Sequence, residues 1–380
     1  MRLHHVRVLG PTGLSMPQTV DVNAEGAHDR DATGLVLSPG WMDLHAHLRD
    51  PGFPQKETLL SGATSAAIGG FTHVLAMANT DPVIDQEERL ESLVARSEAL
   101  PIRIGFVGAV TVGLEGRELT DAAALKAAGA LALSDDGRNA MTAVVLDRAL
   151  EAAAEAGLPV LIHAQAERLG TGPDAEAAAV TDALDALRGV PAARLHVQHV
   201  STHRATELIR VAKAQGLAVT AEVTPHHLAL TEQDASAMGP HGNVNPPLRT
   251  SDDREALRQA LVDGVIDVIA TDHAPHERAA KETGAYGFHG FETALGVILG
   301  LDVDPRVIYR ACVSRPRTIA GQSLEDEWIL IDPNEEWIVD ASSFKSRGQN
   351  TPFQGRRLRG RVIMTICRGQ VVTERLMQHG

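Results

Sequence analysis

Short runs of apolar and β-branched residues alternate along most of the chain with longer stretches in which apolar residues recur every three or four positions. The short runs predict eight buried strands: Leu35–Leu44, Thr72–Met77, Arg103–Val110, Ala130–Leu133, Pro159–Ile162, Arg194–Val197, Ala218–Val223 and Ile266–Ala270. The longer stretches predict amphipathic helices such as Gln86–Leu100, Met141–Ala156, Thr202–Gln215 and Ser251–Val262. Because strands and helices alternate, we expect parallel strands joined by right-handed crossovers.

Eight such units over roughly 280 residues fit an α/β fold of the (β/α)8 TIM-barrel type, whose usual size is about 250 residues or more. A doubly wound open sheet is the competing topology. The two ends of the chain differ, because short runs such as Trp328–Ile331 and Trp337–Asp340 are separated by turn residues and no long helix. We therefore expect a small β domain formed by residues 1–35 and 325–380, with the barrel over residues 36–324 inserted between them.

The composition supports a large folded core, since 44% of the 380 residues are hydrophobic and 22% are charged. The formal net charge of −14 argues against nucleic acid or an anionic membrane as a partner. No segment approaches the ~18 apolar residues that cross a bilayer, and the first residues lack the apolar core of a signal peptide, so we expect a cytoplasmic protein. Cys312 and Cys367 form no CxxC pair and predict neither a disulfide framework nor a thiolate zinc site.

Polar side chains gather where the predicted barrel strands end, which is the face that carries the active site in this fold. The residues that follow the predicted strands include His45, His47, Asn79, Asp135, Asp136, His163, His199, Asp272 and His276. In a chain with 17 histidines, chance alone predicts about one His-x-His triplet, so His45 and His47 prove little by themselves. However, alternate residues of a strand face the same side, and these two imidazoles would project together as metal ligands must.

Each of the other residues also has a structural explanation. A lone His163 or His199 is more often a hydrogen-bonded core histidine, Asp136 lies in an Asp-Asp-Gly sequence that suits a turn, and Asp272 could cap a helix. All of these explanations would have to hold together at one end of one barrel for the site to be empty. We therefore predict a metal site at the mouth of the barrel.

Four histidines and two aspartates exceed what one catalytic zinc requires, because such an ion takes three protein ligands and a water. Two ions that share a bridging carboxylate would use the whole set. Nitrogen and carboxylate ligands without thiolate suit Zn²⁺, with Co²⁺ or Mn²⁺ as alternatives. A water held between two such ions is a nucleophile near neutral pH, so the predicted chemistry is hydrolysis of a polarised carbonyl or its reverse.

Motifs along nearly the whole chain carry a family resemblance. They are SPGWMDLHAHLRDPG (38–52), GGFTHVLAMANTDPVID (69–85), ALSDDG (132–137), HVQHVST (196–202), TAEVTPHHLALT (220–231), NPPLR (245–249), IATDHAPH (269–276) and NTPFQGRRLRGRV (350–362). The sequence resembles the amidohydrolase superfamily, and within it the class I bacterial dihydroorotases. The resemblance implies the same barrel with a small β domain that the hydrophobic pattern predicts.

The resemblance also implies roles for individual residues. His45, His47 and Asp272 would hold one metal ion, His163 and His199 the other, and Asp136 would bridge them where many relatives use a carboxylated lysine. Asp272 would also act as the catalytic acid and base. The residues that the resemblance places at the substrate are His47, Arg49, Asn79, Asn245, His276, Tyr286 and Gly287. Arg49 in particular would bind the substrate carboxylate with paired hydrogen bonds.

The implied reaction is the reversible, zinc-dependent cyclisation of N-carbamoyl-L-aspartate to L-dihydroorotate in pyrimidine synthesis, with one or two ions per chain and no organic cofactor. A homodimer is expected, as is a possible complex with aspartate transcarbamoylase. The alternatives are another cyclic amidase, such as a hydantoinase or allantoinase, or an inactive subunit that serves as a scaffold for the transcarbamoylase. The chain departs from the family pattern at Ala78, where proline is usual, and in the shorter segments near residues 22–31 and 164–180.

Overall fold

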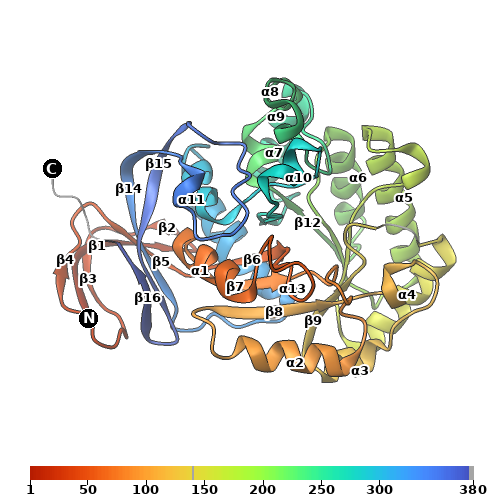
Figure 1. The fold of residues 1–380 in the computed structure, drawn as a ribbon, viewed down its shortest axis with the longest axis horizontal. Helices are drawn as coiled ribbons and strands as arrows, with labels where there is room; N and C mark the ends of the chain where they lie inside the picture. The colour runs from red at the N-terminus through yellow and green to blue at the C-terminus, as the bar shows by residue number, and fades with distance from the viewer. Residues whose placement is uncertain (139–140, 376–380) are drawn as a thin grey trace.

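The computed structural model describes residues 1–138 and 141–375. Its larger part is a barrel of parallel strands that follow one another in chain order (Figure 1): β6 (Trp41–Ala46), β7 (Phe71–Ala76), β8 (Arg103–Gly108), β9 (Ala130–Ser134), β10 (Val160–Ile162), β11 (Leu195–Val197), β12 (Val219–Val223) and β13 (Val268–Ile269). A parallel bridge between Ala46 and His273 joins the first strand to the segment after the last. The predicted (β/α)8 barrel is therefore confirmed, and the doubly wound sheet is excluded.

Helices surround the barrel strands. They include α1 (Leu59–Gly69), α2 (Glu87–Ser97), α3 (Ala122–Ala127), α4 (Ala143–Ala156), α5 (Pro173–Gly189), α6 (His203–Ala214), α9 (Ser251–Asp263) and α11 (Phe291–Leu299). Local sequence sets their ends, because Thr142, Thr202 and Thr250 each accept a hydrogen bond from a backbone amide three residues ahead. Gly157 and Gly264 then end α4 and α9 in the left-handed conformation that glycine adopts without strain.

Further short helices lie between β12 and the C-terminal strands of the second sheet. They are α7 (Pro225–Ala229), α8 (Glu232–Met238), α10 (Arg278–Glu282), α12 (Pro305–Ile308) and α13 (Arg315–Ala320). Helix α13 packs against β6, and Arg317 donates a hydrogen bond to the carbonyl of Gly40 just before that strand, at 2.8 Å. This helix therefore covers the end of the barrel opposite to the predicted site.

Both chain termini contribute to a separate mixed sheet beside the barrel (Figure 1). Its order is β16-β15-β14-β5-β1-β2, and β3 and β4 also pair with β1. The strands are β1 (Arg2–Gly10), β2 (Gly13–Leu14), β3 (Gln18–Asp21), β4 (Arg30–Asp31), β5 (Val36–Pro39), β14 (Trp328–Ile338), β15 (Arg357–Cys367) and β16 (Gln370–Glu374). A small β structure built from both ends is thus confirmed, whereas the exact domain limits 1–35, 36–324 and 325–380 stay a prediction.

Two strand predictions differ from the structure. The run Leu35–Leu44 is two strands, since β5 belongs to the terminal sheet and β6 to the barrel. Between them, a Cβ atom on Gly40 would lie 2.1 Å from the hydroxyl oxygen of Thr72, so the chain passes where a larger residue does not fit. The runs Trp328–Ile331 and Trp337–Asp340 fall mostly within one long strand, β14, whose pairing shifts register between Asp332 and Glu336.

Apolar side chains fill the interior of the barrel. They include Met42, Leu44, Leu75, Met77, Val107, Ala132, Leu161, Val268 and Ala270. A larger apolar cluster packs the strands against the surrounding helices. The interior is therefore a packed core, and chemistry is confined to the strand ends. Within residues 1–138 and 141–375, no helix is both long and apolar enough to cross a membrane.

Candidate active site

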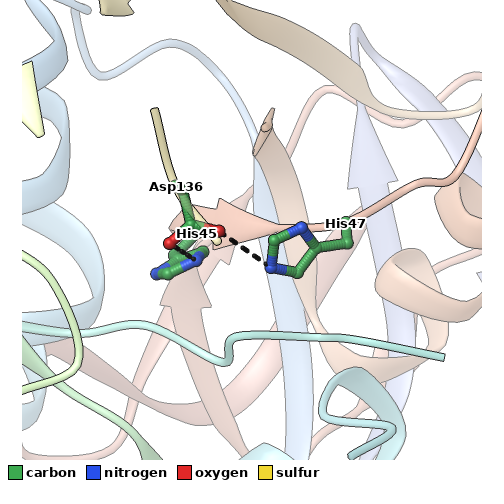
Figure 2. A group of neighbouring side chains, drawn as sticks. All are labelled: His45, His47 and Asp136. Carbon is green, nitrogen blue, oxygen red and sulfur yellow. Dashed lines mark ion pairs between the residues drawn. The ribbon is translucent and has the colours of Figure 1, made fainter. Parts of the chain in front are cut away.

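The predicted ligands meet around one carboxylate. In Figure 2, dashed lines join the carboxylate of Asp136, which follows β9, to the imidazoles of His45 and His47 at the end of β6. The Nε2 atom of His45 lies 3.5 Å from Asp136 Oδ1, and the Nε2 atom of His47 lies 3.3 Å from Asp136 Oδ2. Asp272 approaches the same pair, with its Oδ1 atom 3.1 Å from His47 Nε2 and 3.5 Å from His45 Nε2.

A second pair of imidazoles faces the same carboxylate. Asp136 Oδ1 lies 3.4 Å from His163 Nδ1 and 3.7 Å from His199 Nε2. These two ring nitrogens are 2.8 Å apart, so both point at one small volume. Each of the two sets, His45 with His47 and His163 with His199, brings its ligand atoms together with those of Asp136 within 4.8 Å. Asp136 is thus placed to serve both.

The electrostatics of this cluster favour a bound cation. Burial alone would raise the pKa of Asp136, but the charge of His45 and the contacts from His163 and His199 hold it well below its ordinary value. The buried Oδ1 atom of Asp136 nevertheless has no hydrogen-bond partner among the described residues. A buried, ionised and unsatisfied carboxylate oxygen surrounded by imidazole nitrogens fits a divalent metal ion, because both ligand types bind such ions and a cation compensates the charge.

Local backbone geometry places several of these side chains. His199 and Asp272 both have positive φ angles, 30° and 46°, and so does Arg49, at 57°. Non-glycine residues seldom adopt this conformation, and such strain clusters at functional sites. Asp135, the first aspartate of the Asp-Asp-Gly sequence, accepts hydrogen bonds from the amides of Val110 and Thr111 at 2.8 and 3.0 Å. It therefore anchors the turn that presents Asp136.

A cavity of about 430 Å³ opens beside this cluster of histidines and aspartates. Its lining contains nearly all of the predicted site residues, namely His47, Arg49, Asn79, Asp136, His163, His199, Asn245, Asp272, His276, Tyr286 and Gly287. The remaining predicted ligand, His45, is fully buried beneath them. The structure thus gathers every predicted residue at one place, although their roles stay predictions.

The cavity lining also contains a buried guanidinium, that of Arg49. Burial lowers the pKa of Arg49 to about 10, and its Nε atom has no hydrogen-bond partner among the described residues. Arg49 Nη2 lies 3.3 Å from His276 Nε2, and His276 Nδ1 is likewise buried without a partner in the described chain. Buried donors without acceptors are costly, so this part of the lining is suited to an anionic group that enters the cavity.

Two residues expected to contact the substrate, Asn79 and Gly287, already form hydrogen bonds within the protein. The amide oxygen of Asn79 lies 2.9 Å from His47 Nδ1, and its amide nitrogen donates to the carbonyl of Asp136 at 3.3 Å. The amide of Gly287 donates to the carbonyl of Asn243 at 3.1 Å. Asn79 and Gly287 thus shape the cavity, whereas Asn245 keeps a buried amide oxygen without a partner in the described chain.

Sequence reasoning missed two polar residues of the site. Gln165 lines the cavity, and its amide oxygen lies 3.1 Å from His163 Nε2 and 2.8 Å from the Asn245 side-chain nitrogen. Glu222 lies within β12, in contact with His45 and with the backbone of His199. The sequence offered a hint for each residue. Gln165 is two positions beyond His163, just past the end of a predicted strand. Glu222 is the only charged residue of its strand, and a buried acid needs a polar partner.

The comparison with solved structures shows the same fold. L-hydantoinase (dihydropyrimidinase) from Arthrobacter aurescens superimposes with a TM-score of 0.88 over 98% of this chain and 96% of that one, at 23% sequence identity. A dihydropyrimidinase from Brevibacillus agri gives a TM-score of 0.84 over 98% and 95% of the two chains, at 20% identity. Identity at this level supports the fold alone.

Sequence comparison is more specific. A family model described as Dihydro-orotase-like matches residues 34–217. A dihydroorotase from Anaeromyxobacter dehalogenans is 42% identical over 90% of this chain and 88% of its own length. A dihydroorotase from Thermus aquaticus is 39% identical over 97% of this chain and 96% of its own. With identity of this extent over barrel, terminal sheet and site together, the chain belongs to the dihydroorotase family of the amidohydrolase superfamily.

Proposed function

We propose that the protein interconverts N-carbamoyl-L-aspartate and L-dihydroorotate, a cyclic amide hydrolysis and its reverse, in pyrimidine synthesis in the cytoplasm. One observation carries the proposal: the cavity is lined both by clustered histidines and aspartates that could hold a metal ion and by a buried guanidinium, Arg49, whose Nε atom has no hydrogen-bond partner among the described residues. The substrate has a matching pair of groups, a scissile amide and a free carboxylate. A hydantoin ring lacks that carboxylate, which distinguishes the proposed substrate from those of the structural neighbours.

Three residues of the cavity would bind the substrate. Arg49, assisted by His276, would bind the substrate carboxylate, and Asn245 would offer its free amide oxygen to a ring N–H group. This binding would turn the scissile carbonyl toward the imidazoles. Because the ring carboxylate and the amide are held at two fixed points, the reacting carbonyl would have one orientation in the cavity.

Asp272 is proposed as the proton carrier. The neighbouring charges of His45 and His47 outweigh its burial and lower its pKa, so it is ionised and can accept a proton. In the ring-opening direction it would take the proton of the attacking water and return it to the departing amide nitrogen. In the cyclisation direction the same carboxylate would carry the proton the other way.

Zinc is the proposed metal, with one or two ions per chain. His45, His47 and Asp272 would hold one ion, His163 and His199 the other, and Asp136 would lie between them. When bound, such ions make water acidic enough to ionise near neutral pH and polarise a carbonyl. The protein's own part is to fix the ring orientations, as where His47 Nδ1 faces the amide oxygen of Asn79 and leaves Nε2 directed at Asp136.

The decisive experiment is a ring-opening assay on L-dihydroorotate with the purified chain, before and after metal removal by a chelator and after Zn²⁺ is restored. We expect activity that is lost with the metal and regained with Zn²⁺. Hydantoin and allantoin serve as competing substrates, and a preference for either would favour the other cyclic amidases. A chain that binds no stoichiometric metal and shows no turnover would instead fit the scaffold alternative.

We also propose a homodimer, and a complex with aspartate transcarbamoylase remains part of the proposal. Both come from the family resemblance. Light scattering of the purified chain, alone and with the transcarbamoylase, measures the mass of each species directly. A monomeric mass in both samples would contradict both assemblies.

A further inference from the structure

A carboxylate lies inside the barrel, beneath the proposed metal ligands. Glu222 is on β12, its side chain is 0% exposed, and it does not line the cavity. A buried carboxylate requires compensation from hydrogen bonds or positive charge. The residues that contact Glu222 therefore indicate its structural role.

The first partner is a proposed metal ligand. Glu222 Oε1 lies 2.6 Å from Nδ1 of His45, whose Nε2 atom faces Asp136 and Asp272. An ionised carboxylate only accepts hydrogen bonds, so this short contact places the ring proton on Nδ1. The amide nitrogen of Gln198 also lies near Nδ1, at 3.2 Å, but it cannot donate to a nitrogen that already carries a proton. In the neutral form of the ring, the Nε2 atom of His45 is then the acceptor that a metal ion can use, and Gln198 is its only amide neighbour among the described contacts, at 3.5 Å.

The second partner belongs to the other pair of ligands. The backbone amide of His199 donates to Glu222 Oε1 at 3.2 Å. His199 has the unusual φ angle of 30°, and a hydrogen bond at this residue helps to hold that conformation. The other carboxylate oxygen of Glu222 lies 3.0 Å from His196 Nε2, and the opposite ring nitrogen of His196 lies 2.8 Å from the hydroxyl of Thr220.

We propose that Glu222 is a positioning residue for the metal centre, which fixes the tautomer and orientation of the His45 ring and the backbone of His199 and so raises the metal affinity of both ligand sets. This inference rests on the proposed function, because it requires that the cluster binds metal. Its physical basis is general: a carboxylate that accepts the distal N–H of a ligating imidazole fixes the ring and increases its basicity. Here a single carboxylate reaches both sets.

The test measures Zn²⁺ affinity directly, by competition with a chromophoric chelator, on the metal-free full-length protein. Glu222→Gln keeps the shape of the side chain and removes its charge, and we expect Zn²⁺ affinity to fall by about 10- to 100-fold. The matched control is Glu327→Gln, since Glu327 is also buried, at 2% exposure, but pairs with Arg103 away from the cluster. The control is expected to keep wild-type affinity. Thermal unfolding of the metal-free variants accompanies the titrations, because a merely structural carboxylate would alter stability and leave affinity unchanged.

Neutron diffraction on zinc-loaded wild-type crystals keeps the inference testable even where Glu222→Gln does not fold. We expect deuterium on His45 Nδ1, directed at Glu222, and none on Nε2. Deuterium on Nε2, or unchanged Zn²⁺ affinity in folded Glu222→Gln, would overturn the inference and leave the proposed function standing. A wild-type chain that binds no Zn²⁺ would overturn both.

Discussion

The carboxylate of Asp43 accepts hydrogen bonds from both the amide and the hydroxyl of Thr271, a residue 228 positions away in sequence. The hydrogen bond from the Thr271 amide to Asp43 Oδ1 measures 3.0 Å. The same oxygen also accepts a hydrogen bond from the backbone amide of His45, at 3.1 Å. Thr271 directly precedes Asp272, and Asp43 precedes His45 by two residues. One buried carboxylate thus ties together the two strand ends that present these proposed ligands.

Replacement of Thr271 by valine tests the contribution of its hydrogen bonds with Asp43. The valine keeps the shape of the side chain but removes the hydroxyl that donates to Asp43 and accepts from the amide of His273. We expect the free energy of unfolding to fall by about 1–3 kcal/mol, because buried groups lose their partners. Urea denaturation measures the change. Thr318→Val, on the exposed side of α13, is the control and should change stability little; equal losses in the two variants would contradict the role of these hydrogen bonds.

Asp272→Ala is expected to abolish turnover. The substitution removes the proposed proton carrier together with one metal ligand, and general acid–base catalysis alone is typically worth about 10²- to 10⁴-fold. Steady-state assay in both directions measures the loss, and Zn²⁺ titration separates the loss of metal from the loss of the proton carrier. Asp174→Ala, at a side chain 85% exposed, is the control. A rate for Asp272→Ala within tenfold of wild type would remove Asp272 from the mechanism.

The convergence of the proposed ligands could be predicted from sequence because barrel strands project their C-terminal residues to one face, so that residues far apart in sequence meet. The partners that hold the ligands were harder to predict. Glu222 lies inside a strand that the hydrophobic pattern predicts. That pattern does not show which side chains a buried acid contacts. The division of Leu35–Leu44 into two strands was missed for a related reason, since both halves are buried and burial does not reveal which sheet a strand joins.

Arg49→Met should mainly weaken substrate binding. Methionine retains the length of the side chain and loses the charge-assisted hydrogen bonds, which are worth about 1.5–3 kcal/mol. We therefore expect KM for L-dihydroorotate to rise at least tenfold while kcat changes less, since the guanidinium would contact the same carboxylate throughout the reaction. Arg204→Met, at an arginine 67% exposed, is the control. An unchanged KM would show that Arg49 does not bind the substrate.

Lys281 joins two segments that border the cavity. Its side chain is fully buried, and its ammonium group donates to the carbonyls of Asn243, Ala285 and Gly287 at 2.7, 2.8 and 3.1 Å. The ring of Phe288 lies beneath the ammonium, 5.1 Å from its centre. Burial lowers the pKa of Lys281 from 10.5 to about 8, because a charged group is disfavoured away from water.

This shift predicts a pH dependence of stability. Between pH 8 and 10.5 the unfolded chain still holds a proton on Lys281 that the folded protein has released, so the free energy of unfolding rises with pH over this range. Lys281→Met lacks the titrating group, and the difference between wild type and variant isolates its contribution from other residues. Urea denaturation of both proteins from pH 7 to pH 10 should show wild-type stability increasing relative to the variant above pH 8. If the free energies of unfolding of the two proteins changed in parallel across this range, Lys281 would have its ordinary pKa in the folded protein. The three carbonyls would then fully compensate the burial of its ammonium group.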